Sequence, residues 1–129
     1  MRRIVPILAI IAAIATVALG RGPKLDKEGK QWLSGYSEPA KVNVTGTWKA
    51  KEWGQVKLVQ EQGSREVSGR GDGWEITGVV SGNAACLLFS GRGGDINYWA
   101  RLTMEGDNKL NGSYARFGSS KTKPMLLMK

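Results

Sequence analysis

The sequence predicts an all-β fold: an antiparallel up-and-down β-barrel of about eight short strands, preceded by a single N-terminal hydrophobic helix. Three observations support this prediction. Apolar and polar residues alternate with a period of two in many short segments after residue 42, and turn residues separate these segments roughly every 8–12 residues. An apolar run also precedes them near the N-terminus. The chain therefore divides into residues 1–20 as a membrane anchor or signal peptide, 21–41 as a linker and 42–129 as the barrel domain.

The N-terminal segment begins with Arg2 and Arg3 and continues as an apolar run from Ile4 to Leu19. The run has about 16 residues, between the roughly 7–15 of a signal-peptide core and the roughly 17–25 of a spanning helix. Small residues before Arg21 would suit cleavage, whereas the basic residues that follow hinder export of the next segment. We favour a retained anchor that crosses the cell membrane once, with the C-terminal domain on the periplasmic or extracytoplasmic side. Cleavage is the alternative.

Residues 21–41 contain glycine and proline at several positions, which interrupt any periodicity and predict a linker without a helix. The sizeable apolar side chains of this linker are Trp32, Leu33 and Tyr36. We expect these three to lie at the membrane interface or to close one end of the following domain.

The predicted strands share the period-two alternation or a short apolar run between turn residues. They are 44–50, 56–60, 66–69, 74–80, 84–89, 96–104, 110–114 and 123–128. Glycines inside several of these strands suit sharply coiled strands. Closing the meander into a barrel removes its two open edges, and such edges promote aggregation. We expect the lumen to be largely filled by the inward side chains Trp48, Trp74, Tyr98, Leu102 and Tyr114.

The first predicted strand contains Gly46-Thr47-Trp48. This tripeptide resembles the glycine-x-tryptophan signature of the calycin superfamily, which includes lipocalins and avidins. The resemblance implies a barrel in which Trp48 plugs one end and an arginine from a late strand covers it. Arg116 is the residue that could take this role. The resemblance also implies that the barrel could carry a small apolar ligand.

Composition argues against catalysis and against nucleic-acid binding. The chain has 19 Lys and Arg, 11 Asp and Glu and no histidine, which removes the commonest general base and metal ligand. The net charge of +8 is spread along the chain, which suits a surface near anionic headgroups better than a nucleic-acid groove. Cys86 lies in an apolar run and is expected to be a buried hydrophobe. Arg70-Gly71-Asp72 is expected to form a hairpin turn. We expect no enzyme activity, no catalytic residues, no cofactor and no metal.

Two functions remain after these exclusions. The first is a non-catalytic, membrane-anchored accessory subunit of a larger membrane protein complex, for example a respiratory or photosynthetic one, whose barrel packs on the exported face. The alternative is an exported carrier of a small apolar ligand. Retention of the anchor and the free volume of the lumen distinguish the two. The partners expected for the first are other subunits and the lipid bilayer, and the candidate contact residues are Trp53, Trp99, Arg101, Ala9, Ala12 and Ala13.

Overall fold

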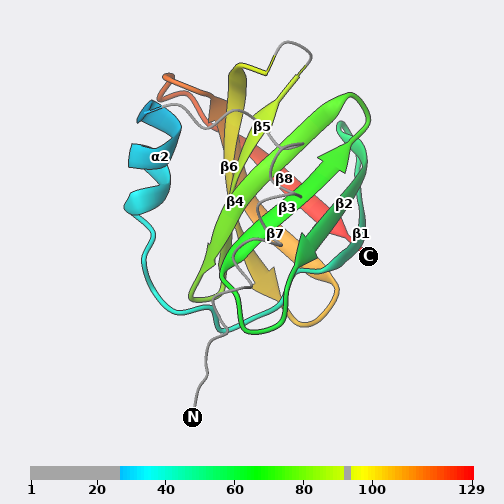
Figure 1. The fold of residues 1–129 in the computed structure, drawn as a ribbon. Coiled ribbons are helices and arrows are strands. Elements are labelled where there is room, and N and C mark those ends of the chain that lie inside the picture. The colour runs from blue at the N-terminus through cyan, green and yellow to red at the C-terminus, as the bar shows by residue number, and fades with distance from the viewer. Residues whose placement is uncertain (1–26, 92–93) are drawn as a thin grey trace.

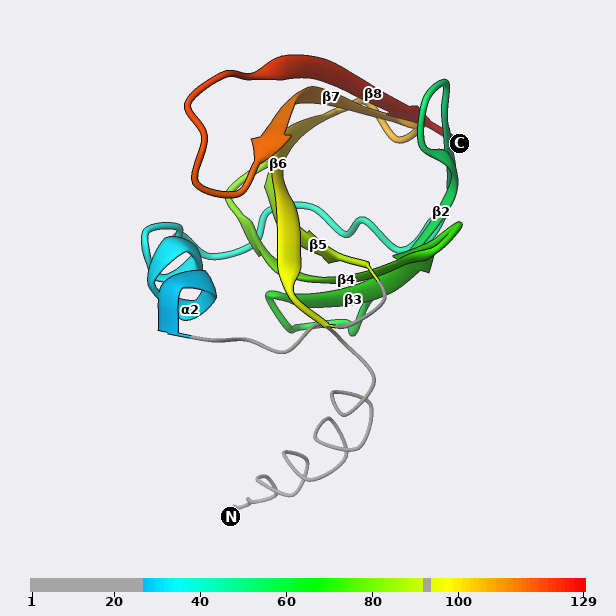
Figure 2. The same ribbon diagram turned by 90° about the horizontal axis from the view of Figure 1, so that it is seen from above.

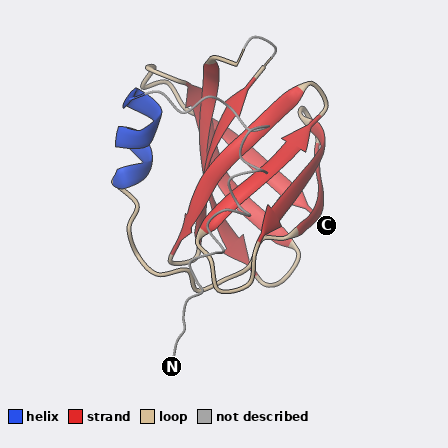
Figure 3. Ribbon diagram, in the orientation of Figure 1, coloured by secondary structure: helices blue, strands red, loops and turns tan. Residues whose placement is uncertain are grey.

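The computed structural model describes residues 27–91 and 94–129, so the predicted anchor (residues 1–20) lies outside the described residues. The described part forms a closed antiparallel barrel in which each strand pairs with the next along the chain (Figures 1 and 3). Its strands are β1 (Gly46–Ala50), β2 (Gly54–Gln60), β3 (Glu66–Gly71), β4 (Trp74–Ser81), β5 (Ala84–Ser90), β6 (Ile96–Glu105), β7 (Lys109–Arg116) and β8 (Lys123–Met128). The predicted all-β class and the up-and-down barrel are confirmed.

The barrel closes where β8 returns to β1. These two strands are paired only at Lys49 and Met128, because the chain leaves β1 at Ala50 and turns into the β1–β2 hairpin. Seen from above, the strands form a complete ring (Figure 2). The seam between β1 and β8 is therefore the least paired part of the wall.

Side chains that point into the interior of the barrel form the hydrophobic core. Trp48, Leu58, Ile76, Leu102 and Leu127 are all fully buried there. Alternation places the polar residues between them outside, as the period-two pattern predicts. The strand β5 is the exception, because every one of its residues is buried. Its apolar sequence is consistent with this burial, since a strand covered on both faces has no polar side.

One end of the barrel is closed by a buried glutamine. The Oε1 atom of Gln60 accepts a hydrogen bond from the Val44 N–H at 2.9 Å, and its Nε2 donates to the carbonyls of Val42 at 3.2 Å and Ser64 at 2.9 Å. The side-chain amide thus satisfies backbone groups of the entering chain and of the β2–β3 turn. These bonds hold residues 42–44 across this end of the barrel, which we name the closed end.

Glycines let neighbouring strands approach closely, as the sequence suggested. A Cβ atom on Gly78 would lie 2.0 Å from the carbonyl oxygen of Cys86, and one on Gly112 would lie 2.0 Å from that of Arg101. No side chain fits at either position without moving a strand. A hairpin does form at the predicted Arg70-Gly71-Asp72, but Arg70 and Gly71 still belong to β3, and its turn residues are Asp72 and Gly73.

The prediction of a linker without a helix is wrong, because α2 (Lys27–Ser34) forms in that segment. The helix lies outside the ring beside β6 (Figure 2), where the Trp32 and Trp99 rings are 5.8 Å apart. The Arg101 guanidinium lies over the Tyr36 ring at 5.7 Å. These three aromatic side chains are half-buried, so the segment covers the barrel wall instead of one of its ends. Nowhere in residues 27–91 or 94–129 is a helix long and apolar enough to cross a bilayer.

Candidate functional site

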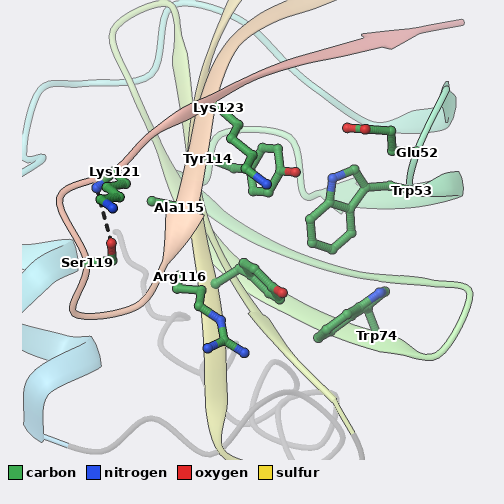
Figure 4. A pocket seen from close by; sticks show the side chains of 10 residues that line it. Glu52, Trp53, Trp74, Tyr114, Ala115, Arg116, Ser119, Lys121 and Lys123 are labelled. Atoms are coloured by element: carbon green, nitrogen blue, oxygen red, sulfur yellow. Dashed lines mark hydrogen bonds between the residues drawn. The ribbon is translucent and has the colours of Figure 1, made fainter.

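The end of the barrel opposite the closed end is hollow. A cavity of about 490 Å³ lies there, between the β1–β2 hairpin, the start of β4 and β6, and the β7–β8 connection (Figure 4). We name this cavity the mouth. Its lining residues are Glu52, Trp53, Trp74, Tyr98, Tyr114, Ala115, Arg116, Ser119, Lys121 and Lys123.

Strand alternation explains why the mouth is aromatic. Trp74 lies two residues before the core residue Ile76, so both side chains point into the ring. Tyr114 lies four residues after the core residue Leu110 and points inward for the same reason. Near the closed end most inward positions other than Trp48 carry aliphatic residues, whereas at the mouth several carry large rings. The rings are half-buried and pack on the core below them.

Trp53 has no place in a strand pattern, because it lies in the turn between β1 and β2. The turn directs its indole into the mouth (Figure 4). The ring centroid lies 5.3 Å from that of Trp74, 5.0 Å from that of Phe89, and 5.2 Å from those of Tyr98 and Tyr114. These separations are typical of favourable aromatic pairs. Trp53 is therefore the centre of a five-ring cluster and separates the mouth from the filled core.

The rim of the mouth is cationic. Arg116 follows Tyr114 by two residues, and Lys123 is paired with Tyr114 across β7 and β8, so the two cations flank this ring. Lys121 belongs to the β7–β8 connection, where its backbone N–H donates to Ser119 Oγ at 3.1 Å (Figure 4). Glu52 is the carboxylate among the lining residues.

The expected filling of the lumen is right for one half of the barrel only. Trp48 and Leu102 are fully buried in the core. Trp74, Tyr98 and Tyr114 are half-buried and line the mouth instead, which leaves free volume above the core. The sequence identified these inward positions correctly but could not show at which level of the barrel the side chains stop filling the space.

The expected cover of Trp48 by Arg116 is wrong. Trp48 donates from Nε1 to the Val44 carbonyl at 2.9 Å, which holds the indole toward the closed end. The cation over its ring is the Lys129 ammonium, 5.0 Å from the ring centroid. Arg116 is at the last residue of β7 and lines the mouth, so it lies at the other end of the barrel. A cation therefore does lie over the buried Trp48, but Lys129 provides it and not Arg116.

The candidate partner-contact residues lie in three different environments. Trp53 was expected at an exposed turn, and its indole is instead packed inside the mouth. Trp99 points out of the ring as expected, yet the chain's own Trp32 packs against it. Arg101 is exposed and lies over Tyr36. Contact of these residues with a partner stays a prediction. Ala9, Ala12 and Ala13 lie outside the described residues.

Cys86 is fully buried, as predicted for a small hydrophobe in an apolar run. Burial raises the pKa of its thiol to about 11, although Arg101 and Arg65 act in the opposite direction. The thiol is therefore protonated at neutral pH and is a poor nucleophile. Within the described ranges, no group of His, Cys, Asp and Glu side chains is arranged to hold a metal ion.

A second hollow lies at the weakly paired seam and shares Glu52 and Trp53 with the mouth. Its volume is about 520 Å³, and its apolar lining residues are Ala50, Trp53, Pro124, Met125, Leu126 and Met128. Leu126 and Met128 point away from the core and are 42% and 41% exposed. This surface, unlike the face under α2, is not covered by the described residues.

Comparisons of the chain with protein-family models, with curated proteins and with solved structures find no match.

Proposed function

We propose that the barrel binds a small, mainly apolar molecule with its mouth. The observation that carries this proposal is a cavity of about 490 Å³ whose wall is built from Trp53, Trp74, Tyr98 and Tyr114. Small-molecule sites in proteins are typically concave, apolar and aromatic, with volumes of roughly 300–1,000 Å³. The free volume supports the carrier over the accessory subunit, because a filled lumen would have left no room for a ligand.

The rings of the mouth are suited to binding a flat or bulky apolar group. Trp74, Tyr98 and Tyr114 are held by strands and Trp53 packs against all three, so these rings lose little conformational freedom when a ligand packs against them. Their edges and faces are already arranged at angles between 53° and 89° around Trp53 and Trp74. A ligand would therefore meet preformed surfaces. These lining residues act in recognition, and the proposal includes no chemical step.

A neutral fluorescent probe tests this function. Phenylnaphthylamine is a flat apolar molecule whose emission rises when it leaves water. We expect the full-length protein to bind it saturably. We expect Trp74→Ala to weaken this binding about tenfold, because it removes one wall of the mouth; tenfold in affinity corresponds to about 1.4 kcal/mol.

The matched control is Trp32→Ala, which removes an equally large ring from the outer layer beside β6. This variant should bind the probe as the unmodified protein does. Absence of saturable binding, or equal weakening by both variants, would contradict the proposed function. Melting curves of both variants show whether each remains folded.

The accessory subunit is the second candidate, and the uncovered surface of β8, β1 and β2 favours it. The large hydrophobic side chains exposed in the described part of the chain are Val59, Leu126 and Met128, and all three belong to these strands. In this candidate the anchor holds the domain at the exported face of a membrane complex, and the exposed surface contacts other subunits or lipid. Purification in mild detergent followed by mass spectrometry of co-purifying chains tests it. A monodisperse monomer that retains a small molecule would favour the carrier.

A further inference from the structure

We propose that the ligand of the mouth carries an acidic group, which Arg116 and Lys123 bind beside Tyr114. This inference rests on the proposed function, since it names the chemical class of the molecule that the mouth takes: an apolar or aromatic body with one negative charge.

The positions of the two cations support an acidic ligand. Arg116 and Tyr114 are two positions apart in β7, so their side chains lie on the same face of the strand. Lys123 lies two residues before the core residue Met125, so its side chain points toward the mouth as well. Both line the cavity together with the aromatic wall (Figure 4). The fold thus places two positive charges at inward positions, beside the rings that β4, β6 and β7 carry at the mouth.

Among the described residues, neither cation forms an ion pair with a carboxylate. In residues 27–91 and 94–129, the one ion pair joins Arg70 and Glu75, on the β3–β4 hairpin, at 3.6 Å. Glu52 also lines the mouth but pairs with neither Arg116 nor Lys123. The local charge is therefore positive and can be neutralised by a bound anion. Both side chains can donate charge-assisted hydrogen bonds to carboxylate, sulfonate or phosphate oxygens, so either position of the rim can bind an anion.

The same charges argue against the other class of ligand that aromatic rings bind. Rings such as Trp53, Trp74 and Tyr98 can hold a quaternary ammonium group by cation–π attraction. A cationic ligand at this site would lie close to Arg116 and Lys123 and would be repelled by both. An anion gains from the same arrangement while its apolar body packs on the rings.

The gain from charge should be moderate, because Arg116 and Lys123 are exposed to solvent. Water and salt screen exposed charges, so we expect an effect of about tenfold in affinity and not of several orders of magnitude. This expectation also predicts that added salt weakens the binding of an acidic ligand and leaves that of a neutral ligand unchanged.

Two dyes with one skeleton test the inference. Anilinonaphthalene sulfonate carries a sulfonate, and phenylnaphthylamine is the same molecule without it. We expect the unmodified full-length protein to bind the sulfonate about tenfold more tightly than the neutral dye. Arg116→Gln and Lys123→Gln should each weaken sulfonate binding, about tenfold together, and should change the affinity for the neutral dye less than twofold.

The control variant is Lys57→Gln, which removes one exposed positive charge from β2 at a position that points away from the lumen. It should leave both affinities unchanged. Equal affinities for the two dyes, or equal effects of Lys57→Gln and Arg116→Gln, would overturn the acidic ligand while the proposed function stands. If neither dye binds saturably, the proposed function fails as well. Unchanged melting temperatures of the variants exclude unfolding as the cause of weaker binding.

Discussion

The close approach of β2 and β3 can be tested with two glycines of one strand. Gly69 and Gly71 both belong to β3, both are half-buried, and both side-chain positions point toward the lumen. A Cβ atom on Gly69 would lie 2.2 Å from the carbonyl oxygen of Lys57, whereas one on Gly71 would lie 3.5 Å from that of Gln55. Alanine should therefore be rejected at the first position and accepted at the second.

The expected magnitudes follow from these distances. Real Cβ atoms essentially never approach another atom within 3.0 Å, so Gly69→Ala must push β3 and β2 apart by roughly 0.8 Å. A shift of this size breaks neighbouring ladder hydrogen bonds, at about 1 kcal/mol each, and adds overpacking strain of about 1–3 kcal/mol. We expect Gly69→Ala to lower the free energy of unfolding by about 3 kcal/mol. Gly71→Ala should raise it by about 0.4–1 kcal/mol, because alanine restricts the unfolded chain.

Urea denaturation followed by tryptophan fluorescence measures both variants against the unmodified protein. The transition midpoint should fall for Gly69→Ala and stay or rise for Gly71→Ala, with an unchanged dependence on urea. In a thermal scan the loss corresponds to roughly 10 °C or more for a domain of this size. Equal stability of the two variants would show that the strands separate freely, and the steric reasoning would then be wrong.

Two further predictions concern buried side chains. Trp48→Ala should lower the free energy of unfolding by about 3–5 kcal/mol, because the indole is fully buried. Trp32→Ala should lower it by about 1 kcal/mol, because that ring is half-exposed. Urea denaturation measures both losses. The pKa of the Cys86 thiol is about 11 in the native state and 9.0 in the unfolded chain. Between these pH values the unfolded thiol loses its proton first, so the free energy of unfolding falls as the pH rises. Relative to Cys86→Ala, the unmodified protein should lose about 2 kcal/mol between pH 9 and pH 11; parallel stability curves would contradict the raised pKa.

Much of the barrel could be predicted from local patterns. Alternation of apolar and polar residues depends on neighbours two positions apart, so each strand and its inward face could be identified separately. The apolar run at Cys86 likewise predicted a buried Cys86, whereas burial of every residue of β5 was found only in the structure. Turn residues between the strands predicted hairpins, and hairpins between successive strands leave closure as the means to remove both edges.

Features that depend on distant parts of the chain could not be predicted in this way. The helix α2 has eight residues, which are too few for a clear periodicity in the sequence. In the fold, its Trp32 packs against Trp99 of β6, a residue far away in the sequence. The direction of Trp53 is set by a turn, where no alternation applies. The register of strand pairing around the barrel determines which cation covers Trp48. It brings Lys129 close to the indole and places Arg116 at the opposite end of the barrel.

The all-β class, the strands and the residues that face inward could be predicted from the sequence, because they follow from the alternation along each strand. The three-dimensional structure was needed to show that the inward residues fill one half of the barrel and leave a cavity above that half. Its volume depends on how far each strand extends past its neighbours and on the turn that inserts Trp53. Those are relations between strands that are far apart in the chain, and no local pattern of residues encodes them.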